Sequence, residues 1–361
     1  MRKQILSLLL AAISLTTAQA REPQALAWLN NVKLSGYVLT QYQYSGKEGA
    51  KANSFNIRMA RMALDGRIKK DWYWKIQFQM NGDNSNYSND IRLVDVFAEW
   101  QKLDFLKVKA GQFKRPFTFE NPMNPIDQGF MSYSQNVNQL AGFADRNGMR
   151  ASNGRDIGLQ LQGDFLKNAA GRNLVHYQVG VFNGQGINTK DVDQQKDIIG
   201  GLWIMPVKGM RIGAFGWEGS YSRTGADGIV KLPQHRYALS AEYLFNDWTV
   251  RTEYVHATGK AFKDSEDKKT VTINDAIGSK SDGYYALVIA PVVKDKFYLK
   301  ARYDLYRPSA SWRDSNTQWE AGFNYKFSKN IQLNAEYALI NNRALAEHNY
   351  SMIDAELDFR F

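Results

Sequence analysis

Cysteine is absent from the 361 residues of this chain, and proline is scarce, with only 8 residues. Without cysteine, disulfide bonds, thiolate metal sites and a cysteine nucleophile are excluded. No stretch after residue 20 approaches the roughly 20 apolar residues that a membrane-spanning helix needs. Aromatic residues are abundant at 13%, and 44% of the chain is hydrophobic. This composition is too apolar for a disordered protein, so we expect a folded chain.

Catalytic motifs are missing as well. The 4 histidines form no His-Glu-x-x-His motif, and no Gly-x-Ser-x-Gly motif occurs. These absences argue against a zinc enzyme and against a serine hydrolase. We therefore expect no metal, no cofactor and no enzymatic activity. The histidines are interpreted as wall, rim or loop residues: His176, His235, His256 and His348.

The first 20 residues have the pattern of a secretory signal peptide. Arg2 and Lys3 provide a positive start, residues 5–13 are mostly apolar, and Ala18-Gln19-Ala20 matches a cleavage site. The apolar part is too short to span a bilayer as a helix. We predict a signal peptide at 1–20 and export to the periplasm or the outer membrane.

Most of the remaining chain alternates apolar and polar residues with a period of two. At the end, for example, Leu357, Phe359 and Phe361 alternate with Asp358 and Arg360. This alternation predicts strands with one apolar and one polar face. Sixteen strands are predicted, at 32–43, 54–66, 72–81, 91–100, 105–113, 155–163, 174–183, 197–206, 210–219, 235–245, 248–258, 283–293, 297–306, 317–327, 331–340 and 350–361.

The predicted strands suit a membrane barrel better than a soluble sandwich. They are about ten residues long, the length that a tilted strand needs to cross a bilayer, whereas soluble strands usually have about five or six. Tight turns alternate with longer polar loops, as in outer-membrane barrels with short periplasmic turns and long external loops. We predict an all-β fold, a 16-stranded antiparallel transmembrane β-barrel over residues 21–361, in the outer membrane of a Gram-negative bacterium.

The loop at 114–154 is the main functional candidate, because connections of this length are usually functional or disordered. Its five aromatic residues favour packing over disorder. A loop packed inside a wide barrel would narrow the channel and bring its basic residues to the passing solute. These residues are Lys114, Arg115, Arg146 and Arg150. The alternative is an external cap that never enters the lumen.

Charge on the predicted inner wall is mixed. The whole chain has a formal charge of +10, but the inward strand positions carry nearly equal numbers of basic and acidic residues. Basic residues in the turns are expected to meet lipid head groups, and a mixed wall suits a hydrated lumen rather than a nucleic acid. Any anion preference then depends on where particular basic residues lie, with Arg61, Lys75, Lys107 and Lys109 as the wall candidates.

Four segments resemble the phosphate-selective porin O and P family. They are GQFKRPFTFE at 111–120, RDIGLQLQG at 155–163, YQVGVFNGQG at 177–186 and GYYALV at 283–288. The resemblance implies a homotrimeric 16-stranded porin whose third loop folds inward as a constriction. It also implies anion preference through lysines and arginines along the pore. Lys114 and Arg115 match the motif that enters the long loop, and Arg155 matches the motif that leaves it.

These observations favour a porin that lets small hydrophilic solutes diffuse passively, with a preference for anions such as phosphate. A sugar-specific channel, lined by aromatic side chains rather than charges, is an alternative. A general non-selective channel is another. A barrel enzyme is disfavoured by the missing motifs.

Overall fold

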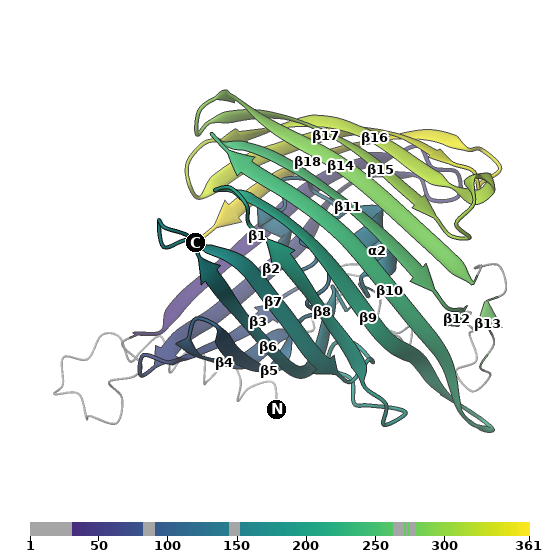
Figure 1. The fold of residues 1–361 in the computed structure, drawn as a ribbon. Helices are drawn as coiled ribbons and strands as arrows, with labels where there is room; N and C mark the ends of the chain where they lie inside the picture. Colours follow the sequence, from purple (N-terminus) through teal and green to yellow (C-terminus); the bar gives the residue numbers. More distant parts are fainter. Residues whose placement is uncertain (1–30, 82–90, 144–151, 263–270, 272, 275–278) are drawn as a thin grey trace.

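The computed structural model describes residues 31–81, 91–143, 152–262, 271, 273–274 and 279–361. In this part of the chain sixteen strands form a closed antiparallel barrel, and β18 closes the ring on β1 (Figure 1). The strands are β1 (Lys33–Ser45), β2 (Ala52–Ile68), β3 (Trp72–Gln79), β4 (Arg92–Leu103), β5 (Leu106–Lys114), β6 (Arg155–Lys167), β7 (Asn173–Phe182), β8 (Asp197–Ile204), β9 (Met210–Gly225), β10 (Gly228–Phe245), β11 (Trp248–Thr258), β14 (Lys280–Val293), β15 (Phe297–Arg307), β16 (Asn316–Lys326), β17 (Ile331–Asn342) and β18 (Asn349–Arg360). Two short strands, β12 (Ala261–Phe262) and β13 (Ile273–Asn274), form a separate sheet.

Each of the sixteen predicted strands is present, and the predicted fold class is confirmed. The largest difference concerns β9 and β10, because the alternation predicts a loop between residues 219 and 235. Instead, the two strands stay paired as far as Gly225 and Gly228 and form a long hairpin (Figure 1). The apolar alternation fades in this extension, since a hairpin that projects beyond the barrel wall needs no lipid-facing side.

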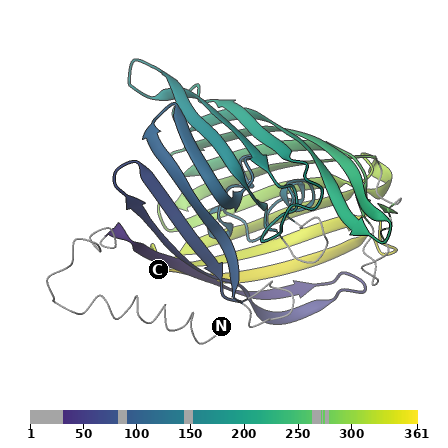
Figure 2. The same cartoon turned by 90° about the horizontal axis from the view of Figure 1, so that it is seen from below.

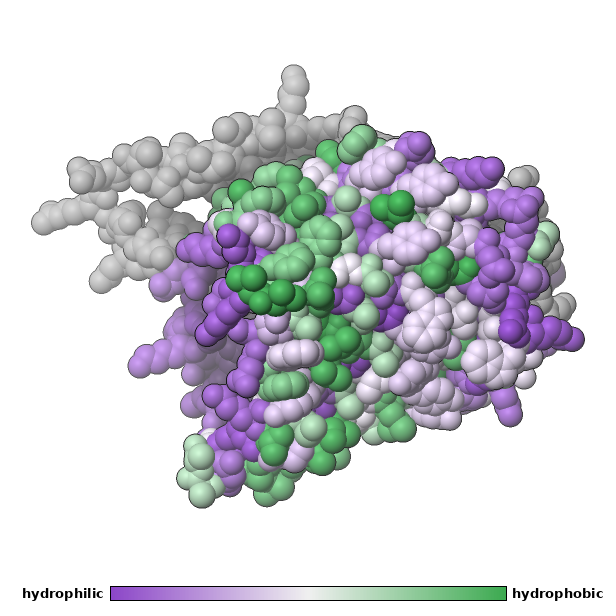
Figure 3. Space-filling view, turned by 90° about the horizontal axis from the view of Figure 1, so that it is seen from above, coloured by the Kyte–Doolittle hydropathy of each residue, from purple (hydrophilic) through white to green (hydrophobic). Residues whose placement is uncertain are grey.

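The wall has the two faces that the period of two predicts. On β10, Tyr237 and Leu239 point outward and are at least half exposed, whereas Arg236, Ala238 and Ser240 are buried on the inside. Figure 3 shows apolar and aromatic residues across the middle of the outer surface, with hydrophilic residues toward its margins. Apolar outside and polar inside is the arrangement of a barrel that lies in lipid and encloses water.

The two ends of the barrel differ in their connections. One end has only short turns, among them Asp104–Phe105 between β4 and β5, and Asn246–Asp247 between β10 and β11. The other end carries the longer connections, including the 40 residues from 115 to 154 between β5 and β6. By the rule for bacterial barrels, the end with short turns is periplasmic. No helix among the described residues is long and apolar enough to cross a membrane.

Candidate pore constriction

The connection between β5 and β6 enters the barrel. Viewed along the opening, Figure 2 shows it inside the ring of strands, with its short helix α2 (Gln135–Leu140). A single 3-10 turn, η2 (Pro125–Asp127), precedes the helix. Ser134 caps α2, since its hydroxyl accepts a hydrogen bond from the backbone nitrogen of Val137 at 3.4 Å. The described residues 115–143 of this connection are called the inward loop below.

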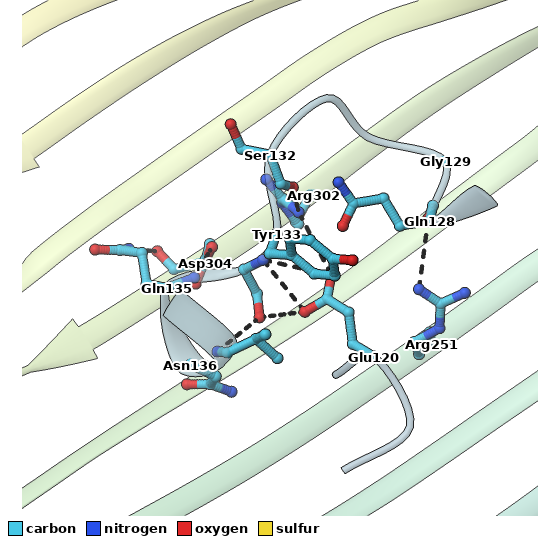
Figure 4. A network of polar contacts seen from close by, with 12 residues as sticks. Glu120, Gln128, Gly129, Ser132, Tyr133, Gln135, Asn136, Arg251, Arg302 and Asp304 are labelled. Atoms are coloured by element: carbon cyan, nitrogen blue, oxygen red, sulfur yellow. Dashed lines mark hydrogen bonds and ion pairs between the residues drawn. The ribbon is translucent and has the colours of Figure 1, made fainter. Parts of the chain in front are cut away.

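Carboxylates of the barrel wall hold the inward loop by its backbone N–H groups. Oε1 of Glu253 accepts from the backbone nitrogens of Phe119 and Glu120, at 2.7 and 2.9 Å. Asp304 accepts from Gln135 N at 2.8 Å (Figure 4). Glu336 accepts in the same way, from Met131 N at 2.8 Å. Hydrogen bonds to charged groups are about twice as strong as neutral ones, so these contacts fix the path of the loop.

Basic residues of the wall hold the backbone carbonyls of the same loop. Nζ of Lys300 donates to Gly129 O at 3.0 Å, and Arg302 donates to Ser132 O at 2.9 Å. The loop is therefore bound through both donors and acceptors of its main chain. Two further arginines also donate to loop carbonyls, Arg58 to Met131 and Arg236 to Leu140.

The loop aromatics pack as the sequence predicts. Phe117 and Phe119 are at most 3% exposed and meet Phe215 and Trp217 of β9 edge to face, with ring centroids 5.4 to 6.4 Å apart. Each fully buried phenylalanine contributes about 1.5–3 kcal/mol through the area it removes from water. This cluster therefore fixes the first part of the loop against β9.

Lys114 holds the entrance of the loop. Its ammonium group donates to the carbonyls of Asn121 and Met123, at 2.7 and 2.5 Å, and to the hydroxyl of Tyr133 at 2.7 Å. Burial raises the pKa of Tyr133, so its hydroxyl stays protonated and donates to Met123 O at 2.6 Å. All three donors of Lys114 are thus used within the loop.

Arg115 is enclosed as well, with a side chain that is 0% exposed. Its guanidinium pairs with Asp156 at 2.8 Å, donates to Gly142 O at 2.8 Å and lies over the ring of Trp217. Gly142 has φ +74, and a Cβ there would lie 2.4 Å from Nη1 of Arg115, so only glycine fits. Arg115 ties the two arms of the loop together and does not reach the lumen.

Two further candidates lie beside the loop. Arg155 forms an ion pair with Asp95 at 2.6 Å. Arg61 donates to Gln79 at 3.0 and 3.1 Å and to the hydroxyl of Tyr37 at 3.1 Å. Both arginines are at most 2% exposed. Their charge contributes to the potential in the lumen without direct exposure to solute.

Lys75, Lys107 and Lys109 are the candidates that reach the lumen, with side chains 21%, 25% and 18% exposed. Lys75 lies 3.7 Å from Asp95, and Lys109 lies 3.7 Å from Glu99. These two carboxylates are only 8% and 5% exposed, so each lysine covers its acidic partner. Lys107 pairs with Asp164 at 3.1 Å, and that carboxylate is 22% exposed. The remaining two candidates, Arg146 and Arg150, lie outside the described residues.

Sequence reasoning missed Arg58, which points inward and pairs with Glu356 at 2.5 Å. A register shift at Leu39/Thr40 places this residue in a β-bulge of β2. Because a bulge adds one residue, it turns a side chain to the face opposite the one that strict alternation predicts. Nothing in the local sequence marks the bulge.

Charges of both signs line both sides of the ring, but the side chains that reach the lumen differ. On β3–β5 the inward lysines reach the open lumen, whereas on β11 and β15–β17 the acidic residues are buried together with Lys300 and Arg302. These parts of the ring are opposite one another, because β5 and β15 are eight strands apart in the sixteen-stranded circle. The covered acidic residues are Glu253, Asp304, Glu320 and Glu336, each at most 8% exposed.

A closed barrel with apolar outer and polar inner walls, and with a loop folded into its lumen, defines a membrane channel. No group of three or more histidine and acidic side chains in the described part of the chain could hold a metal ion. The family model described as Gram-negative porin matches residues 7–345. The chain belongs to the Gram-negative porin family, is located in the outer membrane and acts as a channel rather than an enzyme.

Solved structures show the same fold at low sequence identity. An anion-selective porin from Comamonas acidovorans has a TM-score of 0.65 and 16% identity, over 91% of this chain and 99% of that one. OmpF of Salmonella typhi, in complex with daunomycin, has a TM-score of 0.63 and 12% identity, over 92% of this chain and 98% of that one. The trimer form of OmpT of Vibrio cholerae has a TM-score of 0.55 and 15% identity, over 91% of this chain and 99% of that one. No curated protein matches the chain in a sequence comparison.

Proposed function

We propose that this porin prefers anions among the small hydrophilic solutes that diffuse through it. The proposal depends on one observation, the relative exposure of the wall charges. Lys75 is 21% exposed and Asp95 beneath it 8%, and Lys109 is 18% exposed and Glu99 beneath it 5%. A solute in the lumen therefore meets ammonium groups first, although the wall as a whole is nearly neutral.

The physical cause is the length of the side chains. A lysine has a four-carbon stem, so its charge extends into water while the stem covers the wall. An aspartate on the next strand stays close to the backbone. On the opposite wall the acidic residues are occupied by the inward loop, as Glu253 and Asp304 show. These carboxylates accept hydrogen bonds from backbone N–H groups, and the loop shields their charge from the lumen.

The inward loop is proposed as the constriction, and selection then follows from its width and from the charge of the wall facing it. Three narrower expectations remain proposals beside it: preference for phosphate, assembly as a homotrimer and a signal peptide at 1–20. One neighbour is named an anion-selective porin, which supports anion preference in general, and another is a trimer form, which supports the homotrimer by likeness. The signal peptide lies outside the described residues.

The test is the reversal potential of the pore in a planar bilayer under a KCl gradient. Wild-type protein should give a chloride-selective potential. The variant Lys75→Gln/Lys109→Gln should lower chloride permeability and raise potassium permeability by up to about fourfold each per lysine, since a unit charge about 5 Å away in water is worth about 0.8 kcal/mol.

Lys167→Gln is the matched control, because Lys167 pairs with Asp104 in the turns at the end of the barrel and both side chains are more than half exposed. It removes the same charge at a distance from the constriction and should leave the potential almost unchanged. A wild-type pore that is cation-selective or non-selective would contradict the proposal and would favour the general channel.

A further inference from the structure

A second group of lumen side chains lies nearer the end with short turns. It consists of Lys107 on β5, Asp164 on β6, His176 on β7, Trp203 on β8 and Arg211 on β9. The register places them in one row, because Asp164 is opposite His176, and His176 is opposite Trp203. The proposed constriction does not use this row.

Direct contacts connect the row from one end to the other. Lys107 Nζ lies 3.1 Å from Asp164, whose other oxygen is 2.8 Å from Nδ1 of His176. The imidazole stacks on the indole of Trp203, with ring centroids 4.0 Å apart and planes inclined by 17°. The side chains of the row therefore contact one another and form one continuous surface.

Arg211 completes the row from the side of the inward loop. Its guanidinium lies 4.0 Å from the ring centroid of Phe119, and Phe119 meets Trp203 edge to face at 5.5 Å. Nε of Arg211 donates to Glu242 at 2.7 Å. The side chain is 28% exposed, so the part of the guanidinium beyond Nε faces the lumen.

Several donors of this row have no partner among the described residues. Both terminal nitrogens of Arg211 and the indole N–H of Trp203 make no hydrogen bond there. Both nearby carboxylates already have partners: Glu242 is only 4% exposed and binds Arg211 and Arg251, and Asp164, 22% exposed, binds Lys107 and His176. A surface with free donors, a net positive charge and a stacked pair of rings suits a flat molecule that carries a carboxylate.

We propose that this row is a binding subsite for small aromatic carboxylates on their way through the pore. The carboxylate accepts hydrogen bonds from Arg211 and from Trp203, while Lys107 adds a second positive charge. The ring of the solute extends the stack of His176 and Trp203. The inference rests on the proposed anion preference, because it names the class of anion that the pore retains best.

Block of the chloride current by benzoate tests the subsite, with cyclohexanecarboxylate as the matched probe. Both carry one carboxylate on a six-membered ring, but only benzoate is flat and aromatic. For the wild-type pore, half-block should need an at least about threefold lower concentration of benzoate, which corresponds to one aromatic pair. Equal block by the two anions would overturn the proposal, even in a pore that is anion-selective.

Single substitutions test where in the pore benzoate binds. Arg211→Gln should weaken block by both anions, and Trp203→Leu should abolish the preference for benzoate. If Trp203→Leu fails to fold because it also packs on Phe119, then His176→Leu tests the stack instead. Lys75→Gln is the control: it should reduce chloride selectivity and keep the benzoate preference. Loss of that preference in Lys75→Gln, with no change in Arg211→Gln, would move the site to the constriction and contradict the proposal.

Discussion

The carboxylate of Glu253 binds the backbone nitrogen of Phe119 at 2.7 Å, across 134 positions of sequence. The same oxygen also accepts from the next nitrogen of the chain. The contact joins the first part of the inward loop to β11, so it helps to determine how far the loop extends into the lumen.

Glu253→Ala should therefore loosen the loop. Two backbone N–H groups lose a charged acceptor, and contacts of this kind are worth about 1.5–3 kcal/mol each. We expect a larger or noisier single-channel conductance from a barrel that still inserts into bilayers. Glu218→Ala is the control, because Glu218 is 65% exposed and pairs with His235 outside the lumen. An unchanged conductance in Glu253→Ala would show that the loop does not depend on this contact.

Arg115→Met should destabilise the barrel, because it leaves Asp156 charged and fully buried. Breaking a buried ion pair on one side costs about 3–5 kcal/mol. The check is the temperature at which the folded band is lost in gel electrophoresis with detergent. The double variant Arg115→Met/Asp156→Asn should recover part of the loss. Lys167→Met breaks an exposed pair and should cost under about 1 kcal/mol; an equal loss in both single variants would refute the argument.

Gly129→Ala should displace the loop for two reasons. The residue has φ +94, and a Cβ would lie 2.3 Å from Cδ1 of Ile289. The shift would also weaken the contacts of its carbonyl with Lys300 and Asn324. Single-channel conductance is again the measurement.

Gly49→Ala separates these two causes. Gly49 has φ +72 but no atom within 4 Å of its Cβ position, so it carries the backbone strain without the clash. We expect normal conductance in Gly49→Ala and altered conductance in Gly129→Ala. The same conductance in both variants would mean that the loop tolerates the clash.

Chloride selectivity should fall as salt rises. Exposed lysines act on ions through water, and the Debye length shortens from about 10 Å at 0.1 M to about 3 Å at 1 M. Reversal potentials in equal-ratio KCl gradients around these two concentrations measure the change. Selectivity that stays constant would show that pore width, and not lysine charge, discriminates between the ions.

Sequence alone was sufficient for the barrel, because lipid on one side and water on the other impose a local period of two on every strand. The alternation of Leu357, Phe359 and Phe361 with Asp358 and Arg360 is an example that needs no knowledge of the fold. The alternation did not predict the β9–β10 hairpin beyond residue 219, because those residues do not face lipid. It also did not predict the inward direction of Arg58, because the register shifts at that bulge.

The sequence predicted less about the residues of the constriction than about the barrel. Lys114 and Arg115 are basic residues in the right loop, yet the structure uses them to fasten it, since both find acceptors within hydrogen-bond distance. Whether a lysine covers its acidic partner, as Lys75 does over Asp95, depends on the register between neighbouring strands. That register is a property of the folded sheet, and no single segment contains it.

Besides the aromatic cluster of Phe117 and Phe119, contacts of the main chain with Glu253, Asp304, Lys300 and Arg302 hold the inward loop. Main-chain atoms are the same in every residue, so the anchor imposes little on the side chains that face the water. In the described part of the loop, Pro122, Asp127, Ser132, Asn138 and Gln139 are exposed. The exposed side chains of the loop can therefore be changed, by evolution or by design, while the main-chain contacts that hold the loop stay in place.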